Sequence, residues 1–366
     1  MKSSGPKVLY PVRRFLVAVS AVLLVPALVQ AQTHHKRHAA PRPVSAASAS
    51  AQIDSFVARM VTEHSFDRQD LYDFLTQVQP DKSVFTYFRP RPKTRYTPDE
   101  LEELRKAAAL RVQHAVDFYN AHKSALLRAE KQYGVPAVVI VGLIGIETNF
   151  GAYLGKFKEH EVLTTLAFYG THRASYFKMQ LENFLLLARE LSWDRANIPC
   201  SYAGAIGIPQ FMPDNLKPYA VDWNSDGRID LMDPEDAIGS VGNFLAQHGW
   251  VAGQPIATRA AKRVRHKTFV LRTLPGPAPT IWAKTQNFHV IREYNPLDSY
   301  VMAIFILATK VKGVVDHQAD VPALDELQIE VPPTDSDEPA KPANDSDQPE
   351  VPPVPAADPP DATGAL

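Results

Sequence analysis

Residues 138–146 constrain the fold more than any other segment, because nine consecutive apolar or glycine residues there lead directly into Glu147. Pro136 opens this helix-like run, and Gly151 provides a stop signal beyond it. A carboxylate at the end of so apolar a segment loses hydration in its charged form. We therefore expect the pKa of Glu147 to rise toward the range in which it delivers a proton at neutral pH. An exposed glutamate in a last helical turn is the alternative.

Hydrophobic periodicity along the chain is mostly of the helical kind. It predicts helices at residues 53–60, 71–78, 98–118, 173–192, 234–248 and 297–312. The strongest strand candidate is 267–274, which alternates around Phe269 and Leu271. With 366 residues and 45% hydrophobic content, the chain can bury a sizeable core in one large or two ordinary domains. We predict a mainly α fold, of α+β type, with a minor β element.

The two ends of the chain differ from its middle in composition. Basic residues precede an apolar stretch at 15–29, and Ala31 fits the rule for signal-peptidase cleavage, so residues 1–31 are predicted to be a signal peptide. An uncleaved membrane anchor is the alternative, although a stretch interrupted by Pro26 is short for a bilayer. Residues 32–50 are expected to be a flexible linker and residues 320–366 a disordered acidic tail rich in proline. The folded part is then 51–319.

Charge and cysteine content exclude several classes of function. Formal net charge is −1, and the body between a basic N-terminal segment and the acidic tail is close to neutral. Nothing therefore indicates nucleic-acid binding. Cys200 is the only cysteine, so no intramolecular disulfide can form, and stability must come from packing or from a metal. No histidine lies near Cys200 in sequence, which argues against a thiol nucleophile.

A second pattern begins at residue 222, where oxygen-bearing side chains alternate as in an EF-hand-like calcium loop. The pattern includes a turn glycine, Gly227, at position 6. Position 12 is Asp233 instead of the usual bidentate glutamate, and Asp236 would close a longer loop. One such loop in a secreted chain usually fixes structure, so we expect one structural calcium ion and not a calcium sensor. A chance acidic turn is the alternative. The expected ligands are the side chains of Asp222, Asn224 and Asp226, the carbonyl of Arg228, and a closing carboxylate.

Two further segments offer side chains suited to a glycan. Glycines interrupt residues 201–213 and let backbone and ligand approach closely, while Ser201 and Gln210 would offer hydrogen bonds into a cleft. Near the last predicted helix, the rings of Tyr294 and Tyr300 would stack on sugars and the amide of Asn295 would bond acetamido groups. A helix-packing loop and core tyrosines explain the same residues equally well when each segment is taken alone.

Together, these segments resemble the lytic murein transglycosylase B family. The resemblance extends from about residue 50 to 315 and rests on GIETNFG at 145–151, SYAGAIG at 201–207, QFMP at 210–213, the calcium loop and Tyr294-Asn295. It implies a lysozyme-like helical fold with a core at about 130–250 and helical flanking parts at 51–129 and 251–319. It also implies cleavage of the β-1,4 bond between N-acetylmuramic acid and N-acetylglucosamine in peptidoglycan, leaving a 1,6-anhydromuramic acid end.

By this resemblance, Glu147 is the catalytic glutamate. It would protonate the glycosidic oxygen and then, as carboxylate, take the proton of the muramoyl 6-hydroxyl as that oxygen attacks the anomeric carbon. One carboxylate would serve both steps, with the substrate's acetamido group stabilising the charged intermediate, so no second placed carboxylate is needed. The family's longer calcium loop favours Asp236 over Asp233 as closing ligand. Arg173 matches an arginine suited to bonding the acidic or peptide part of the substrate. Residues that match cleft positions are Ser201, Gln210, Tyr294, Asn295 and Tyr300.

The resemblance further implies a periplasmic monomer that acts on peptidoglycan strands and uses calcium but no organic cofactor. Cell-wall synthesis or division proteins are candidate partners. The chain departs from the family in three ways: it lacks the lipid-attachment cysteine of membrane-bound members, matches poorly over 251–290, and ends in the acidic tail. A water-using muramidase, and a non-catalytic peptidoglycan-binding or scaffolding protein on the same fold, are the alternatives. The motifs are compatible with cleavage at chain ends or at internal bonds.

Overall fold

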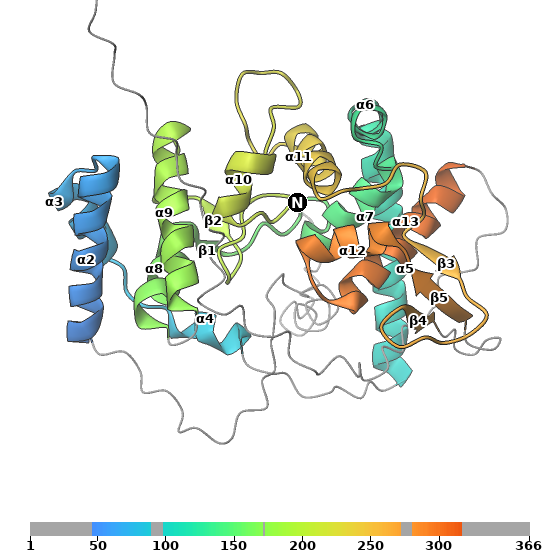
Figure 1. Cartoon of the computed structure of the whole chain (residues 1–366), viewed down its shortest axis with the longest axis horizontal. Helices are drawn as coiled ribbons and strands as arrows, with labels where there is room; N and C mark the ends of the chain where they lie inside the picture. Colours follow the sequence, from blue (N-terminus) through green and yellow to red (C-terminus); the bar gives the residue numbers. More distant parts are fainter. Residues whose placement is uncertain (1–45, 89–97, 171–172, 272–279, 317–366) are drawn as a thin grey trace, which may run out of the picture.

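The computed structural model describes residues 46–88, 98–170, 173–271 and 280–316, and this part of the chain is mainly helical (Figure 1). The predicted signal peptide, most of the predicted linker and the predicted tail lie outside these residues. The first helices are α2 (Ala46–His64), α3 (Arg68–Thr76), α4 (Lys82–Tyr87), α5 (Pro98–Ala121), α6 (Lys123–Tyr133) and α7 (Ala137–Thr148). After them come α8 (Glu159–Thr164), the π-helical turn η1 (Thr165–Tyr169), α9 (Ala174–Glu190), α10 (Pro213–Tyr219), α11 (Pro234–Gln247), α12 (Gln286–Tyr294) and α13 (Asp298–Val315).

The apolar run forms α7, and this helix lies at the centre of the larger hydrophobic core. A helix that is apolar on every face must be covered on every face. Helices α5, α6, α11 and α13 all pack on α7. At Gly142, an added Cβ would lie 3.2 Å from the backbone oxygen of Ile304 on α13. Glycine therefore lets α7 and α13 come together almost backbone to backbone.

A second, smaller core holds the other side of the molecule together. Helices α2, α3, α8 and α9, with the η1 turn, supply its buried residues, which include Phe56, Met60, Phe168 and Phe184. In Figure 1 these helices lie to one side, whereas α5, α7, α12 and α13 lie to the other. The segment after β2 (Pro199–Cys200) lies between the two cores, because its Ile206 belongs to one and its Phe211 to the other.

Strands form a minor part of the fold. β1 (Phe157–Lys158) pairs with β2 in antiparallel register, with Phe157 opposite Cys200. A three-stranded antiparallel sheet has the order β3-β5-β4, from β3 (Ala257–Arg259), β4 (Thr268–Leu271) and β5 (Thr280–Lys284). Trp282 in the central strand lies opposite Arg259 on one side and Phe269 on the other. The predicted mainly helical fold with a small β element is confirmed.

The predicted helices are present with small shifts of their ends. α2 begins at Ala46 and so takes in the last residues of the segment expected to be a linker. The described α-helices not predicted from the sequence are mostly short, and they are α4, α6, α8, α10 and α12. In the described part of the chain no single helix is long and apolar enough to span a membrane. Helices α6 and α7 taken together have the length and apolar composition of a membrane span, but they are bent by 114° where they meet.

Candidate active site

The backbone at the end of α7 turns sharply just after Glu147. Three consecutive residues have positive φ angles: 49° at Asn149, 62° at Phe150 and 85° at Gly151. Left-handed backbone costs energy in a residue that has a Cβ, so it persists only where the surroundings impose it. Here the buried Thr148 hydroxyl accepts a hydrogen bond from the N–H of Gly151 at 3.0 Å. The turn ends the helix and leaves Glu147 in its last turn.

Glu147 combines an enclosed carboxyl with partial access to solvent. The hydroxyl of the fully buried Tyr300 donates to its Oε1 at 2.5 Å, across 153 residues of sequence. Burial raises the pKa of the Glu147 carboxyl to about 8, and the Tyr300 hydrogen bond lowers it in part. The residue as a whole is half-buried. At neutral pH it is mainly protonated and ready to act as an acid.

The loop between β2 and α10 is tied to the helices around Glu147. The hydroxyl of Thr148 donates to the backbone oxygen of Ile208 at 3.0 Å, and that of Tyr294 donates to the oxygen of Pro209. Gly207 adopts φ 77°, and a Cβ there would lie 2.5 Å from the Cβ of Leu231. Helices α7 and α12 thus hold one glycine-dependent loop from two sides.

Several of the predicted cleft residues meet beside this loop. Arg173, Gln210 and Tyr294 line one pocket of about 190 Å³, with Arg173 exposed at its rim. Gln210 has φ 55°, and its side-chain N–H donates to the oxygen of Gly207 at 2.9 Å, so its amide oxygen stays available. Ser201 is half-buried, and its Oγ accepts backbone N–H groups at 3.3 and 3.0 Å. Its hydroxyl proton remains free to donate.

Two predicted contact residues lie deeper than expected. Asn295 is fully buried: its Oδ1 accepts the N–H of Leu297 at 3.2 Å, and its Nδ2 has no partner among the described residues. In this structure Asn295 shapes the turn between α12 and α13 and does not reach the surface. Tyr300 is also fully buried, and its hydroxyl contacts Glu147. Sequence reasoning missed Thr148, whose hydroxyl sits next to the catalytic candidate in the last turn of a predicted helix.

In the predicted calcium loop, side-chain oxygens turn inward onto backbone N–H groups. Asp222 accepts from Gly227 at 2.8 Å, Asn224 accepts from Asp226 at 3.0 Å, and Asp226 accepts from Arg228 at 2.9 Å. Arg228 lies 3.8 Å from the Asp226 carboxylate, at a highly exposed position. The loop thus gathers hard oxygen atoms, the donor type that calcium prefers.

Asp233 and Asp236, the two candidate closing ligands, have different surroundings. Asp233 caps α11, accepting the N–H of Glu235 at 2.7 Å. Asp236 is fully buried and points into the loop, accepting N–H groups of Trp223 at 2.7 Å and Asp230 at 2.8 Å. Asp236 therefore contacts the backbone of the loop, whereas Asp233 serves the start of α11.

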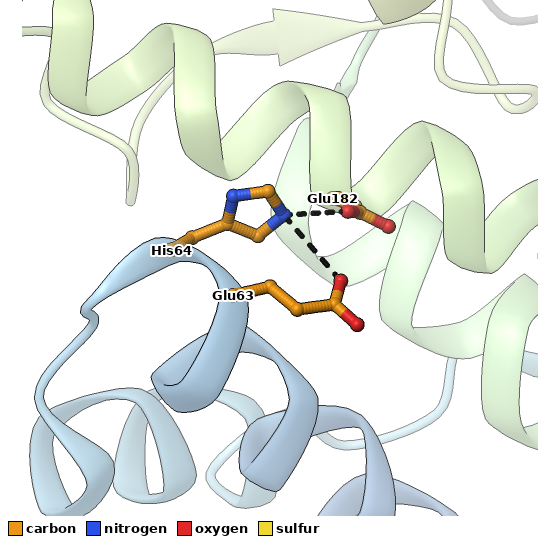
Figure 2. A group of neighbouring side chains, drawn as sticks. All are labelled: Glu63, His64 and Glu182. Atoms are coloured by element: carbon orange, nitrogen blue, oxygen red, sulfur yellow. Dashed lines mark hydrogen bonds and ion pairs between the residues drawn. The ribbon is translucent and has the colours of Figure 1, made fainter. Parts of the chain in front are cut away.

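Away from the cleft, Glu63, His64 and Glu182 bring together side chains of metal-binding type (Figure 2). The Nε2 atom of His64 lies 2.8 Å from Oε1 of Glu182 and 4.0 Å from Oε2 of Glu63. Arg59 binds both glutamates, at 2.7 Å and 3.2 Å, and its hydrogen bond is the main reason that the pKa of Glu182 is lowered. Because Arg59 already neutralises these carboxylates, the cluster is an ion-pair network that joins α2 to α9.

A helical fold that presents one protonated carboxyl beside a glycine-dependent loop defines the class of lysozyme-like enzymes that cleave glycans. Comparison with known proteins narrows this class. The chain belongs to the transglycosylase SLT domain family, whose pattern matches residues 48–273. This confirms the resemblance seen in the sequence.

The relatives of this chain are lytic transglycosylases. It is 36% identical to membrane-bound lytic murein transglycosylase B of Escherichia coli K12, covering 70% of this chain and 81% of that protein. Soluble lytic transglycosylase SltB1 from Pseudomonas aeruginosa has a TM-score of 0.65 and 34% identity, covering 72% of this chain and 99% of SltB1.

Two further solved structures contain bound groups. E. coli Slt35 in complex with calcium has a TM-score of 0.64 and 35% identity, covering 74% of this chain and 94% of Slt35. P. aeruginosa SltB3 in complex with NAG-NAM-pentapeptide has a TM-score of 0.60 and 26% identity, covering 73% of this chain and 80% of SltB3.

Proposed function

We propose that this chain cleaves the β-1,4 bond between N-acetylmuramic acid and N-acetylglucosamine in peptidoglycan and leaves a 1,6-anhydromuramic acid end. The observation that carries the proposal is the carboxyl of Glu147, protonated at neutral pH, half-open to solvent and bonded to Tyr300. Among the described residues, no other carboxylate contributes to the pKa of Glu147. A single acid suits a reaction in which the substrate itself provides the nucleophile.

In the first step, Glu147 gives its proton to the glycosidic oxygen, and the bond from that oxygen to the anomeric carbon of muramic acid breaks. The Tyr300 hydroxyl bonds the carboxylate that results. In the second step, the 6-hydroxyl of the same sugar attacks the anomeric carbon and Glu147 takes its proton. The carboxyl ends the cycle protonated, and no water is consumed.

The flanking residues are suited to holding the glycan strand. Ser201 has a free hydroxyl proton, and Gln210 a free amide oxygen, to offer the substrate. Tyr294 presents a half-buried ring beside Gln210 in the same pocket. NAG-NAM-pentapeptide, the ligand in the solved SltB3 complex, is of the chemical class that we propose for this pocket.

Analysis of the products from purified sacculi tests the proposal. We expect mass spectrometry to find 1,6-anhydromuramic acid ends and Glu147→Gln to abolish their release. Reducing muramic acid ends without anhydro ends would instead identify a water-using muramidase. Unchanged release by the Glu147→Gln variant would show that this glutamate is not the acid.

We also infer that the loop at 222–236 holds one calcium ion with a structural role. Asp222, Asn224, Asp226 and Asp236 would supply side-chain oxygens, and Arg228 its carbonyl oxygen. The oxygen-rich loop and the calcium in the related Slt35 structure support this inference. Bound calcium would offset the repulsion among these carboxylates and fix the loop onto α11.

We further propose that the chain acts as a monomer in the periplasm, to which residues 1–31 would direct it as a cleaved signal peptide. This location would place it beside its substrate, peptidoglycan. Cell-wall synthesis and division proteins are the candidate partners there. Sequencing the N-terminus of the exported protein tests the cleavage after Ala31.

A further inference from the structure

The pocket lined by Gln210 and Tyr294 carries two opposite charges in its lining. Arg173, just before α9, and Glu293, in the last turn of α12, both line it. In Figure 1 the segment that joins β2 to α10 lies between these two helices. It contributes Gln210 and Met212 to the same pocket. The two charges thus face one space from two different elements.

Neither charge is neutralised within the described part of the chain. The guanidinium of Arg173 lies over the ring of Tyr176, 3.9 Å from its centroid, and forms no ion pair there. Glu293 forms no ion pair among these residues either, although the preceding residue, Arg292, binds Asp298 at 3.4 Å. Both side chains are exposed. A free cation and a free anion on one pocket suit a ligand that carries both charges.

The size and walls of the pocket indicate how much of a ligand it holds. Its volume of about 190 Å³ lies below the range of drug-sized sites, so it fits a part of a substrate rather than a whole disaccharide. Phe211, Met212 and Pro296 give the space between the charges an apolar lining. Such a lining accommodates a short aliphatic chain. The shape and charge together match an amino-acid residue with an ammonium group and a carboxylate.

We propose that Glu293 selects substrates by their peptide stems: its carboxylate binds the free ammonium group of a diamino acid in the stem, while Arg173 binds a carboxylate of the same stem. This inference rests on the proposed function and specifies its substrate. A cross-link made through that amine turns it into an amide and removes its charge. The pocket would therefore favour strands whose stems are not cross-linked through this amine.

Kinetics on three forms of one substrate test the proposal: uncross-linked peptide-bearing strands, the same strands with acetylated amines, and peptide-free strands. We expect Glu293→Gln to raise KM roughly three- to tenfold on the first form, with kcat unchanged, because a charged contact at an exposed rim is lost. KM on the other two forms stays unchanged. Acetylation raises the KM of the unmodified chain by the same factor. Glu190→Gln, an exposed glutamate at the far end of α9, is the matched control.

Two results would overturn the inference: an unchanged KM after acetylation, or an equal effect of Glu293→Gln on peptide-free strands. Calorimetric titration of the Glu147→Gln chain with a disaccharide-peptide, before and after acetylation, measures the pocket without turnover. We expect acetylation to weaken binding by the same factor, and equal affinity would contradict the proposal. If the unmodified chain makes no anhydro ends, the proposed function fails, and the titration still decides on Glu293.

Discussion

Two glutamates, Glu147 and Glu159, lie in different parts of this molecule and share one electrostatic property. Burial raises the pKa of each carboxyl to about 8, so both are mainly protonated at neutral pH. Glu147 ends α7 in the larger core, whereas Glu159 begins α8 beside the smaller one. A raised pKa alone therefore does not identify a catalytic acid here.

The surroundings of the two carboxyls differ in access and in hydrogen bonding. Glu147 is half-open and receives the Tyr300 hydrogen bond at 2.5 Å, which stabilises its ionised form. Glu159 is fully buried, and neither of its oxygens has a hydrogen bond of ordinary geometry. The polar group that faces it is the buried thiol of Cys200, a weak donor. Glu147 therefore has a strong donor for its ionised form, as an acid–base catalyst requires, whereas Glu159 faces only the weak thiol donor.

The largest expected effect separates the two glutamates by activity. Glu147→Gln should lower the release of anhydro ends by about a thousandfold, because the proton donor is lost. Glu159→Gln, the matched control, should leave the rate close to that of the unmodified chain. Product release from sacculi measures both. An equal loss in the two variants would remove the functional distinction between these carboxyls.

Removal of the Tyr300 hydroxyl should make Glu147 more like Glu159. Tyr300→Phe takes away the hydrogen bond that lowers the pKa of Glu147, so that pKa should rise further. Activity requires the protonated acid and should fall as pH rises through about 8 in the unmodified chain; in the variant this fall should move to higher pH. We expect kcat to drop by about ten- to a hundredfold, because the carboxylate formed in the first step loses its donor.

A pH–rate profile measures this shift. Tyr72→Phe, a half-buried tyrosine on α3, serves as the matched control. An unmoved alkaline limb in Tyr300→Phe would mean that the limb does not report Glu147.

Stability against pH tests the neutral state of Glu159. Because the folded pKa is raised from 4.5 to about 8, the folded chain binds this proton more tightly than the unfolded chain. Its contribution to stability is full below pH 4.5 and is lost as pH rises through about 8. The Glu159→Gln variant cannot ionise at this position, so it does not lose this contribution. Between pH 6 and 9, its free energy of unfolding should therefore fall by about 2 kcal/mol less than that of the unmodified chain.

Urea unfolding at several pH values measures the difference. Glu161→Gln, an exposed glutamate on the same helix, is the control and should follow the unmodified chain. Parallel pH curves for all three proteins would show that Glu159 ionises freely.

Asp236 adds a third buried carboxyl to the comparison. Backbone N–H groups donate to it, and a bound cation would be its further partner. Calcium should raise the melting temperature of the unmodified chain by a few degrees, on the order of 1 kcal/mol. Asp236→Asn should abolish this response. Asp233→Asn, which alters only the α11 cap, should retain it. Thermal melting of each protein with calcium and with a chelator measures this response. A calcium response that survives in Asp236→Asn would exclude this residue as a ligand.

Properties that depend on neighbours in sequence could be predicted well. The apolar run before Glu147 correctly indicated both a buried helix and a raised pKa, because desolvation there follows from the local sequence. The family and the mainly helical fold were also predicted correctly. Long helices with regular apolar spacing were predicted close to their observed ends, whereas short helices such as α4 and α8 contain too few turns to show a period.

Properties that depend on tertiary contacts could not be predicted from the sequence. The bond from Tyr300 to Glu147 arises because α13 packs on α7, and no local pattern encodes it. Asn295 was expected in the cleft, but its own backbone turn buries it. Glu159 gave no signal in sequence, since its burial comes from the fold around α8. The role proposed for Glu293 could not be predicted either, because it depends on the fold bringing Arg173 to the same pocket.

The near backbone-to-backbone contact of α7 and α13 at Gly142 has a consequence for anyone who wishes to retune the working pH of this enzyme. Glu147 and its donor Tyr300 are carried on the two helices that meet there. The Cβ of an alanine at Gly142 would require the backbone of α13 at Ile304 to move by a few tenths of an ångström, and a shift of α13 also moves Tyr300, so stability and acidity are linked at this contact. A designer should therefore leave this contact intact and vary the side chains around Tyr300, where acidity can be adjusted while the helix pair keeps its spacing.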